Sequence, residues 1–140
     1  MGPESSFFGR YDHSLDAKGR LILPARLRVR LGTRCFLTPH LERCIAVWPI
    51  ETFEAEIEAR KAKAVDSWSR NDMRDWFAAV DEIEIDAQGR ILVALDLRDY
   101  ARLEREVVVV GVDDHVELWS PQGWSTKELA PSGAVLSDRS

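Results

Sequence analysis

Two short motifs with an acidic residue four positions before an arginine could recognise another molecule. Asp16, Lys18 and Arg20 form the first motif, and Asp86 and Arg90 form the second. A tight turn that carries Lys18 and Arg20 projects cations away from the protein body, as contact with a DNA groove and its phosphates requires. Asp16 can orient the Arg20 guanidinium through charge-assisted hydrogen bonds. One such turn would be an ordinary surface ion pair, but two copies, each followed by a helix, predict a DNA-binding function.

The elements around both motifs follow one design: a strand, a tight turn, a return strand and a short helix. Alternating residues from Arg10 to Leu15 predict a half-buried strand, and Gly19 suits the positive φ of a turn. Pro24 fits the first turn of a helix. Residues 84–98 repeat the pattern of residues 14–28, and each copy is followed by a strand that ends in tryptophan, Trp48 or Trp119. The chain is therefore one unit written twice.

The other segments predict helices between the copies and a buried strand after the second. Apolar residues at helical spacing follow Pro49, and Ser69 to Asp72 has the form of a capping box with Ser69 as N-cap, ahead of a second helix. Residues 35–38 and 44–47 predict a hairpin. The apolar run 106–112 predicts a strand buried on both faces, followed by a strand over 116–119 and a helix that begins at Ser120.

Length and composition indicate a small globular protein. The chain has 140 residues, of which 45% are hydrophobic and 31% charged, so we expect one domain or two small halves that share a core. The sequence has no apolar run of the roughly 20 residues that span a bilayer and no signal-peptide pattern at its start. The two cysteines, Cys35 and Cys44, are predicted to be small buried hydrophobes in a reducing cytoplasm.

The distribution of charge differs between the copies. The formal net charge is −5, but residues 1–34 hold seven basic and three acidic residues, whereas residues 81–105 hold four basic and seven acidic ones. Acidic neighbours repel phosphate and weaken non-specific DNA affinity. We therefore predict that the first copy contacts DNA and that the second chiefly completes the fold. Arg26 and Arg30, on one face of the first short helix, are predicted auxiliary phosphate contacts.

Enzymatic and metal chemistry find little support in the sequence. The three histidines, His13, His40 and His115, are scattered, and neither His-x-x-x-His nor Cys-x-x-Cys spacing suggests zinc. His13, Ser14 and Asp16 are neighbours on a strand that point to opposite faces, so they do not form a catalytic triad. We predict no enzyme activity, no catalytic or metal-binding residues and no cofactor.

The combined motifs resemble the MraZ family. They are Asp16-Ala17-Lys18-Gly19-Arg20 with Leu23-Pro24-Ala25, Leu27 and Arg28, then Asp86-Ala87-Gln88-Gly89-Arg90, and finally Val109-Val110-Gly111-Val112 with Glu117-Leu118-Trp119. The resemblance implies a bacterial transcriptional regulator with two tandem SpoVT/AbrB-type domains. It also implies ring-shaped homo-oligomers that bind repeated short DNA sequences upstream of the division and cell wall gene cluster. The second copy departs from the family pattern, since Val93-Ala94-Leu95 lacks the usual proline and Gln88 replaces lysine.

The sequence thus predicts a mainly β (α+β) fold, a swapped-hairpin double-split β-barrel of two pseudo-symmetric repeats with flanking helices. We expect the first repeat over 8–54, a helical spacer over 55–79, the second repeat over 80–125 and a flexible tail over 126–140. The predicted partners are double-stranded DNA and other copies of the chain, with no membrane, and the predicted location is the cytoplasm, in association with the nucleoid. The alternative function is a swapped-hairpin protein-interaction module, either antitoxin-like or a scaffold.

Overall fold

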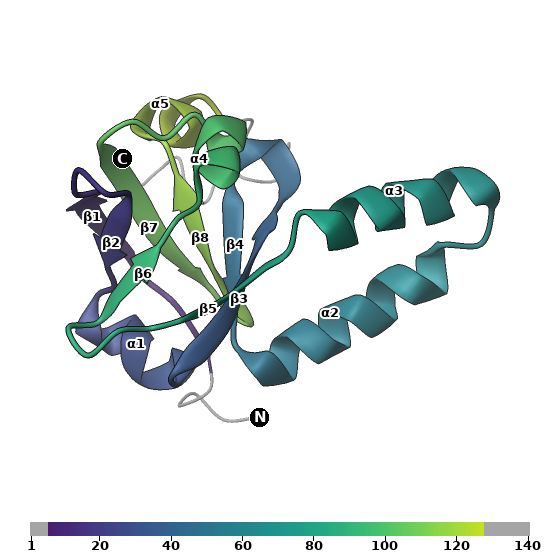
Figure 1. Ribbon diagram of the computed structural model, residues 1–140, viewed down its shortest axis with the longest axis horizontal. Helices are drawn as coiled ribbons and strands as arrows, with labels where there is room; N and C mark the ends of the chain where they lie inside the picture. The colour runs from purple at the N-terminus through teal and green to yellow at the C-terminus, as the bar shows by residue number, and fades with distance from the viewer. Residues whose placement is uncertain (1–5, 128–140) are drawn as a thin grey trace, which may run out of the picture.

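The computed structural model describes residues 6–127 and contains the two repeats separated by a helical hairpin (Figure 1). The first repeat consists of β1 (Arg10–Ser14), β2 (Arg20–Ile22), α1 (Ala25–Leu31), β3 (Arg34–Pro39), the 3-10 helix η2 (Leu41–Arg43) and β4 (Ile45–Trp48). The second consists of β5 (Asp81–Glu84), β6 (Arg90–Leu92), α4 (Leu95–Ala101), β7 (Glu106–Val112), β8 (His115–Trp119) and α5 (Pro121–Thr126). Residues 128–140 of the predicted tail lie outside the described residues.

The strands form a six-stranded antiparallel sheet, ordered β1-β7-β8-β4-β3-β5, and a separate two-stranded ribbon of β2 and β6. The first strand of each repeat pairs with the other repeat, since β1 pairs with β7 and β5 pairs with β3. The mixed α+β class with a dominant antiparallel sheet is as predicted. The predicted swapped-hairpin barrel is not confirmed, because the described residues form these two sheets and no closed barrel.

The main core lies between the ribbon, the short helices and one face of the large sheet. Leu21 of β2 and Ile91 of β6 are opposite one another and fully buried. Leu27 of α1 and Leu97 of α4 occupy equivalent positions in the two repeats and belong to the same core. Because alternate strand residues point to opposite faces, the inward residues of the ribbon alternate with outward ones. Both repeats therefore contribute to one core.

The spacer helices α2 (Ile50–Lys63) and α3 (Ser67–Ala78) form a hairpin that extends away from the side of the body opposite the β2–β6 ribbon (Figure 1). Its base is anchored by a second apolar cluster, in which Phe53 and Trp76 pack against Trp48 on the outer face of the large sheet. None of the described helices is long and apolar enough to cross a membrane.

The capping box of α3 is present but begins three residues earlier than the sequence predicted. Asp66 is the N-cap, and its carboxylate accepts a hydrogen bond of 2.8 Å from the Ser69 backbone N–H. The Ser69 hydroxyl lies 3.3 Å from the Asp66 backbone N–H, which completes the reciprocal pair. The prediction of Ser69 as N-cap was wrong, because Asp66 is also a strong capping residue and its use adds one turn to the helix.

Both cysteines are buried free thiols, as predicted. Burial raises the pKa of Cys35 to about 12, so its thiol is neutral and behaves as a small apolar side chain. In β7, Val107, Val108 and Val109 are buried, whereas Val112 is exposed at the end of the strand. The predicted burial on both faces therefore holds for the first part of that strand only.

Candidate nucleic-acid interface

The first turn is organised by the Asp16 carboxylate. Its Oδ1 accepts hydrogen bonds from the backbone N–H groups of Lys18 (2.9 Å) and Arg20 (2.8 Å). Its Oδ2 accepts from Nε of the Arg20 guanidinium at 2.8 Å. Hydrogen bonds from the Arg20 backbone and, to a smaller extent, the Arg20 side chain lower the pKa of Asp16. The carboxylate is therefore ionised at neutral pH and holds the guanidinium in one orientation.

The second turn has the same geometry. The Asp86 Oδ1 accepts from the backbone N–H groups of Gln88 (2.9 Å) and Arg90 (2.8 Å), and its Oδ2 accepts from Arg90 Nε at 2.8 Å. The Asp86 pKa is also lowered, chiefly by the Arg90 backbone hydrogen bond. In both turns the carboxylate engages Nε. The contacts among the described residues thus leave the two Nη groups of each arginine available to an outside acceptor.

The ribbon places both arginines on one exposed face. In the β2–β6 register, Arg20 is opposite Leu92 and Ile22 is opposite Arg90. These four residues therefore share the outer face of the ribbon, while Leu21 and Ile91 point into the core. Ile22 and Leu92 are each 52% exposed. From strand spacing and rise, the Cα atoms of Arg20 and Arg90 are roughly 8 Å apart. We call these four residues the ribbon face.

Each turn packs against the short helix of the opposite repeat, which the sequence did not suggest. The Gly19 carbonyl accepts a hydrogen bond from the Val93 backbone, and the Gly89 carbonyl accepts one from the Leu23 backbone, both at 2.9 Å. Arg98 of α4 lies against Gly19, where an added Cβ would be 2.9 Å from its Cζ.

Arg28 of α1 lies against the second turn in the same way. A Cβ at Gly89 would overlap its guanidinium, and its Nη1 donates to the Gln88 carbonyl at 3.3 Å. Sequence reasoning gave Arg28 and Arg98 no role. The sequence signal that could have identified them is their position, since Arg28 follows Asp16 by the same number of residues as Arg98 follows Asp86.

Because each turn packs against an arginine of the opposite repeat, the charge around the two turns is more even than the sequence suggests. The first turn has Lys18 and Arg20 beside Arg98, and the second has Arg90 beside Arg28. A charge count for each repeat along the sequence therefore overstates the difference between the turns. The remaining difference at the turns themselves is Lys18 in place of Gln88.

Arg26 and Arg30 both lie beside the ring of Phe8. The guanidinium carbon of each is 5.9 Å from the centroid of the Phe8 ring, and Arg30 Nη1 donates to the Arg26 carbonyl at 2.8 Å. Arg28, between them in the sequence, is the residue that reaches a turn. The structure therefore brings together Asp16, Lys18 and Arg20, and likewise Asp86 and Arg90, whereas Arg26 and Arg30 share the ring of Phe8.

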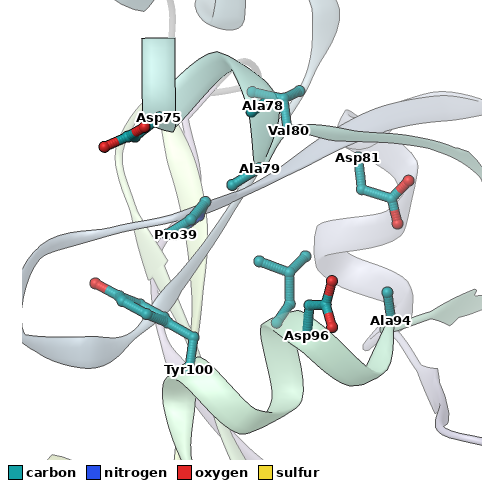
Figure 2. Close-up of a pocket in the computed structure, with 10 residues that line it drawn as sticks. Pro39, Asp75, Ala78, Ala79, Val80, Asp81, Ala94, Asp96 and Tyr100 are labelled. Atoms are coloured by element: carbon teal, nitrogen blue, oxygen red, sulfur yellow. The ribbon is translucent and has the colours of Figure 1, made fainter. Parts of the chain in front are cut away.

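A cavity of about 530 Å³ is acidic and separate from the ribbon face. It lies between the end of α3, β5 and α4, and Asp75, Asp81 and Asp96 line it together with Tyr100 (Figure 2). Three carboxylates at one opening disfavour nucleic-acid phosphates. This cavity therefore does not extend the candidate interface.

Two of the histidines that the sequence leaves scattered are neighbours in the structure. The ring centroids of His40 and His115 are 5.0 Å apart, because the turn after β3 folds beside β8. Their arrangement is separate from the ribbon face.

Comparison with known proteins connects both repeats to one family. The family described as "MraZ protein, putative antitoxin-like" matches residues 6–72 and 76–130. A relative named transcriptional regulator MraZ from Nocardioides sp. is 46% identical over 123 residues, which are 85% of this chain and 83% of the relative. The proteins of that name from Moorella thermoacetica (44% identical, 84% and 83% covered) and Lactiplantibacillus plantarum (41% identical, 87% of each covered) are similar over the same extent. The chain belongs to the MraZ family.

Proposed function

We propose that this protein is a transcriptional regulator that binds double-stranded DNA through the ribbon face and the two turns beside it. The observation that carries this proposal is the pair of arginines, Arg20 and Arg90, each held by a carboxylate on one exposed face. The names of the relatives support a regulatory role. We further propose that the sites are repeated short sequences upstream of the division and cell wall gene cluster, with the protein at the nucleoid in the cytoplasm.

The geometry suits readout in the major groove, which admits a two-stranded β-ribbon. An arginine fixed through Nε can present its terminal nitrogens to the O6 and N7 acceptors of guanine. The exposed side chains of Ile22 and Leu92 could contact thymine methyl groups beside them. Lys18, at the tip of the first turn, can contact phosphate and add to the salt-dependent part of the affinity.

We propose that affinity requires several copies acting together. One chain has a net charge of −5 and presents few cations, so a single ribbon face offers little counterion release. A ring-shaped homo-oligomer on repeated sites would raise the effective concentration of every further contact. Val65 and Trp68, exposed by 78% and 77% on the α2–α3 hairpin, are available for contacts between copies.

The decisive experiment measures binding to the DNA upstream of the protein's own gene at several salt concentrations. We expect wild-type affinity to fall steeply with salt and Arg20→Ala to cost about 1–3 kcal/mol of binding free energy. Arg70→Ala is the matched control, because it removes an exposed arginine from α3, on the opposite side of the body from the ribbon (Figure 1), provided that light scattering shows an unchanged oligomer. Circular dichroism should show equal folding of the three proteins.

The same experiment separates the second candidate function, a protein-interaction module. The exposed Val65 and Trp68 favour this candidate too. An apolar interface would be insensitive to moderate salt. DNA binding that is absent, or equal in Arg20→Ala and wild type with an intact oligomer, would contradict the proposed function and favour a protein partner.

A further inference from the structure

A largely buried polar cluster lies on the face of the large sheet opposite the main core. His115 and Glu117 are alternate residues of β8 and therefore point to the same face. Glu117 is opposite Ala46 of β4, whose small side chain leaves space beside the carboxylate. His40 follows β3, and its ring reaches the same place. We call His40, His115 and Glu117 the His-Glu cluster.

The three side chains bring their donor atoms close together. One ligand atom from each lies within 4.8 Å of the others. Glu117 Oε2 is 2.8 Å from His115 Nε2 and 3.7 Å from His40 Nε2. Four ligands about 2.0–2.2 Å from a tetrahedral zinc ion are separated by roughly 3.3–3.6 Å. The separations of the two histidine Nε2 atoms from Glu117 Oε2, 2.8 and 3.7 Å, lie on either side of this spacing.

Two of the three side chains are already oriented by further hydrogen bonds. Asp114 Oδ1 is 2.7 Å from His115 Nδ1, which fixes the ring with Nε2 directed at Glu117 Oε2, 2.8 Å away. The Trp119 indole N–H donates to Glu117 Oε1 at 2.9 Å, so Oε2 is the oxygen that faces His115. A bound ion would replace the hydrogen bond between Nε2 and Oε2. A carboxylate behind a ligating imidazole is the usual support for a metal-bound histidine.

The ring of His40 has no such supporting hydrogen bond at Nδ1 within the described residues. Its Nδ1 is buried and has no hydrogen-bond partner among the described residues, and the 3.7 Å from its Nε2 to Glu117 is too long for a hydrogen bond. A buried imidazole nitrogen without a hydrogen-bond partner is costly for folding, and an imidazole is a common metal ligand.

Arg60 of α2 acts electrostatically on His40, and its guanidinium is paired with Glu56 at 2.8 Å. The ring of Trp48 stacks on His115 with 4.5 Å between centroids. Cys44 is buried beside Glu117.

We propose that the His-Glu cluster is a divalent transition-metal site, best suited to Zn²⁺. Two imidazoles and one carboxylate favour zinc over Mg²⁺ or Ca²⁺, which take oxygen ligands. Three protein ligands leave a fourth position for water. The ligands come from both repeats, His40 from the first and His115 and Glu117 from the second. Because the site exists only in the folded chain, the ion would lock the two repeats together and stabilise the fold.

The test uses the full chain after treatment with a chelator, with binding measured by calorimetry for Zn²⁺ and by visible absorption for Co²⁺. We expect one ion per chain, a rise in Tm with Zn²⁺, and at least a tenfold loss of affinity in both His40→Gln and His115→Gln. His13→Gln is the matched control, because it removes the third histidine, on β1 away from the cluster, and should bind as wild type does.

Circular dichroism and the Tm of each metal-free variant establish that the folds are intact. Should His115→Gln fail to fold, His40→Gln decides, since His40 contributes no hydrogen bond from Nδ1 that the substitution would break. Three results would overturn the proposal: no binding to the wild type, equal binding to His40→Gln and wild type, or an equal loss in His13→Gln. None of these results depends on whether the protein binds DNA.

Discussion

At the scale of single residues, each turn is built from one aspartate carboxylate, two backbone N–H groups and one arginine guanidinium, arranged in the same way. Asp16 and Asp86 each fix one arginine through Nε and each accept two backbone hydrogen bonds, at distances that agree within 0.1 Å. The carboxylate therefore has two tasks, because it shapes the turn and it orients the guanidinium. The turns differ at their tips, where Lys18 corresponds to Gln88.

This difference predicts unequal contributions to DNA binding. Arg20→Ala should weaken binding more than Arg90→Ala, because Lys18 attracts phosphate beside Arg20 whereas Gln88 beside Arg90 does not. Lys18→Ala should reduce the slope of log affinity against log salt by about one. Titration of one operator fragment with each variant, at equal stability, checks both effects. Equal losses for the two arginine variants would show that the turns contribute alike.

At the scale of elements, each turn depends on the helix of the other repeat. Gly19 and Gly89 have φ values of +82° and +80°. Residues other than glycine adopt this backbone conformation only at a cost in free energy. Their missing side chains also leave space for Arg98 and Arg28. Glycine is therefore required twice at the turn, for its backbone conformation and for the arginine of the opposite repeat.

Gly89→Ala should therefore lose stability through two separable effects. The positive φ costs about 1–3 kcal/mol of unfolding free energy, and displacement of Arg28 adds to it. Urea denaturation of Gly89→Ala, with and without Arg28→Ala, should show a smaller cost of the alanine when Arg28 is absent. Gly32→Ala is the control, since Gly32 also has φ +82° but no atom lies within 4 Å of the added Cβ. The unfolding free energy lost in Gly32→Ala should be the same with and without Arg28→Ala. If the loss in Gly89→Ala is also unchanged by Arg28→Ala, the displacement effect is refuted.

At the scale of the whole molecule, neither repeat can complete its sheets alone. In the described structure β1 pairs with β7, β5 with β3, and β2 with β6, so every one of these ladders joins the two repeats. The buried Leu21 and Ile91 meet across the same boundary. Most of the main core is therefore created only when both repeats are present.

The two repeats should consequently fold as one unit. Fragments 1–79 and 80–140, produced separately, should each fail to form a folded monomer, and an equimolar mixture should regain a cooperative transition. Light scattering gives the mass of each species, and thermal circular dichroism reports the transition. A monomeric fragment that unfolds cooperatively on its own would contradict the shared core.

The sequence determined the local features because they depend on nearby residues. The repeat, the two turns with their Asp–Arg pairs, the glycines at positive φ, the short helices and the buried cysteines follow from spacing and residue type. The cap of α3 was misplaced because Asp66 and Ser69 are both good capping residues within one turn. Local preference alone cannot choose between two such neighbours.

The tertiary structure decided everything that depends on residues distant in the chain. It pairs strands between the repeats, forms two sheets rather than a closed barrel, and places Arg28 over the second turn. It also brings His40 beside His115 and Glu117, which the spacing of the histidines gave no reason to expect. These contacts arise because a strand or helix buries its apolar face against whichever partner completes the core, and that partner lies in the other repeat.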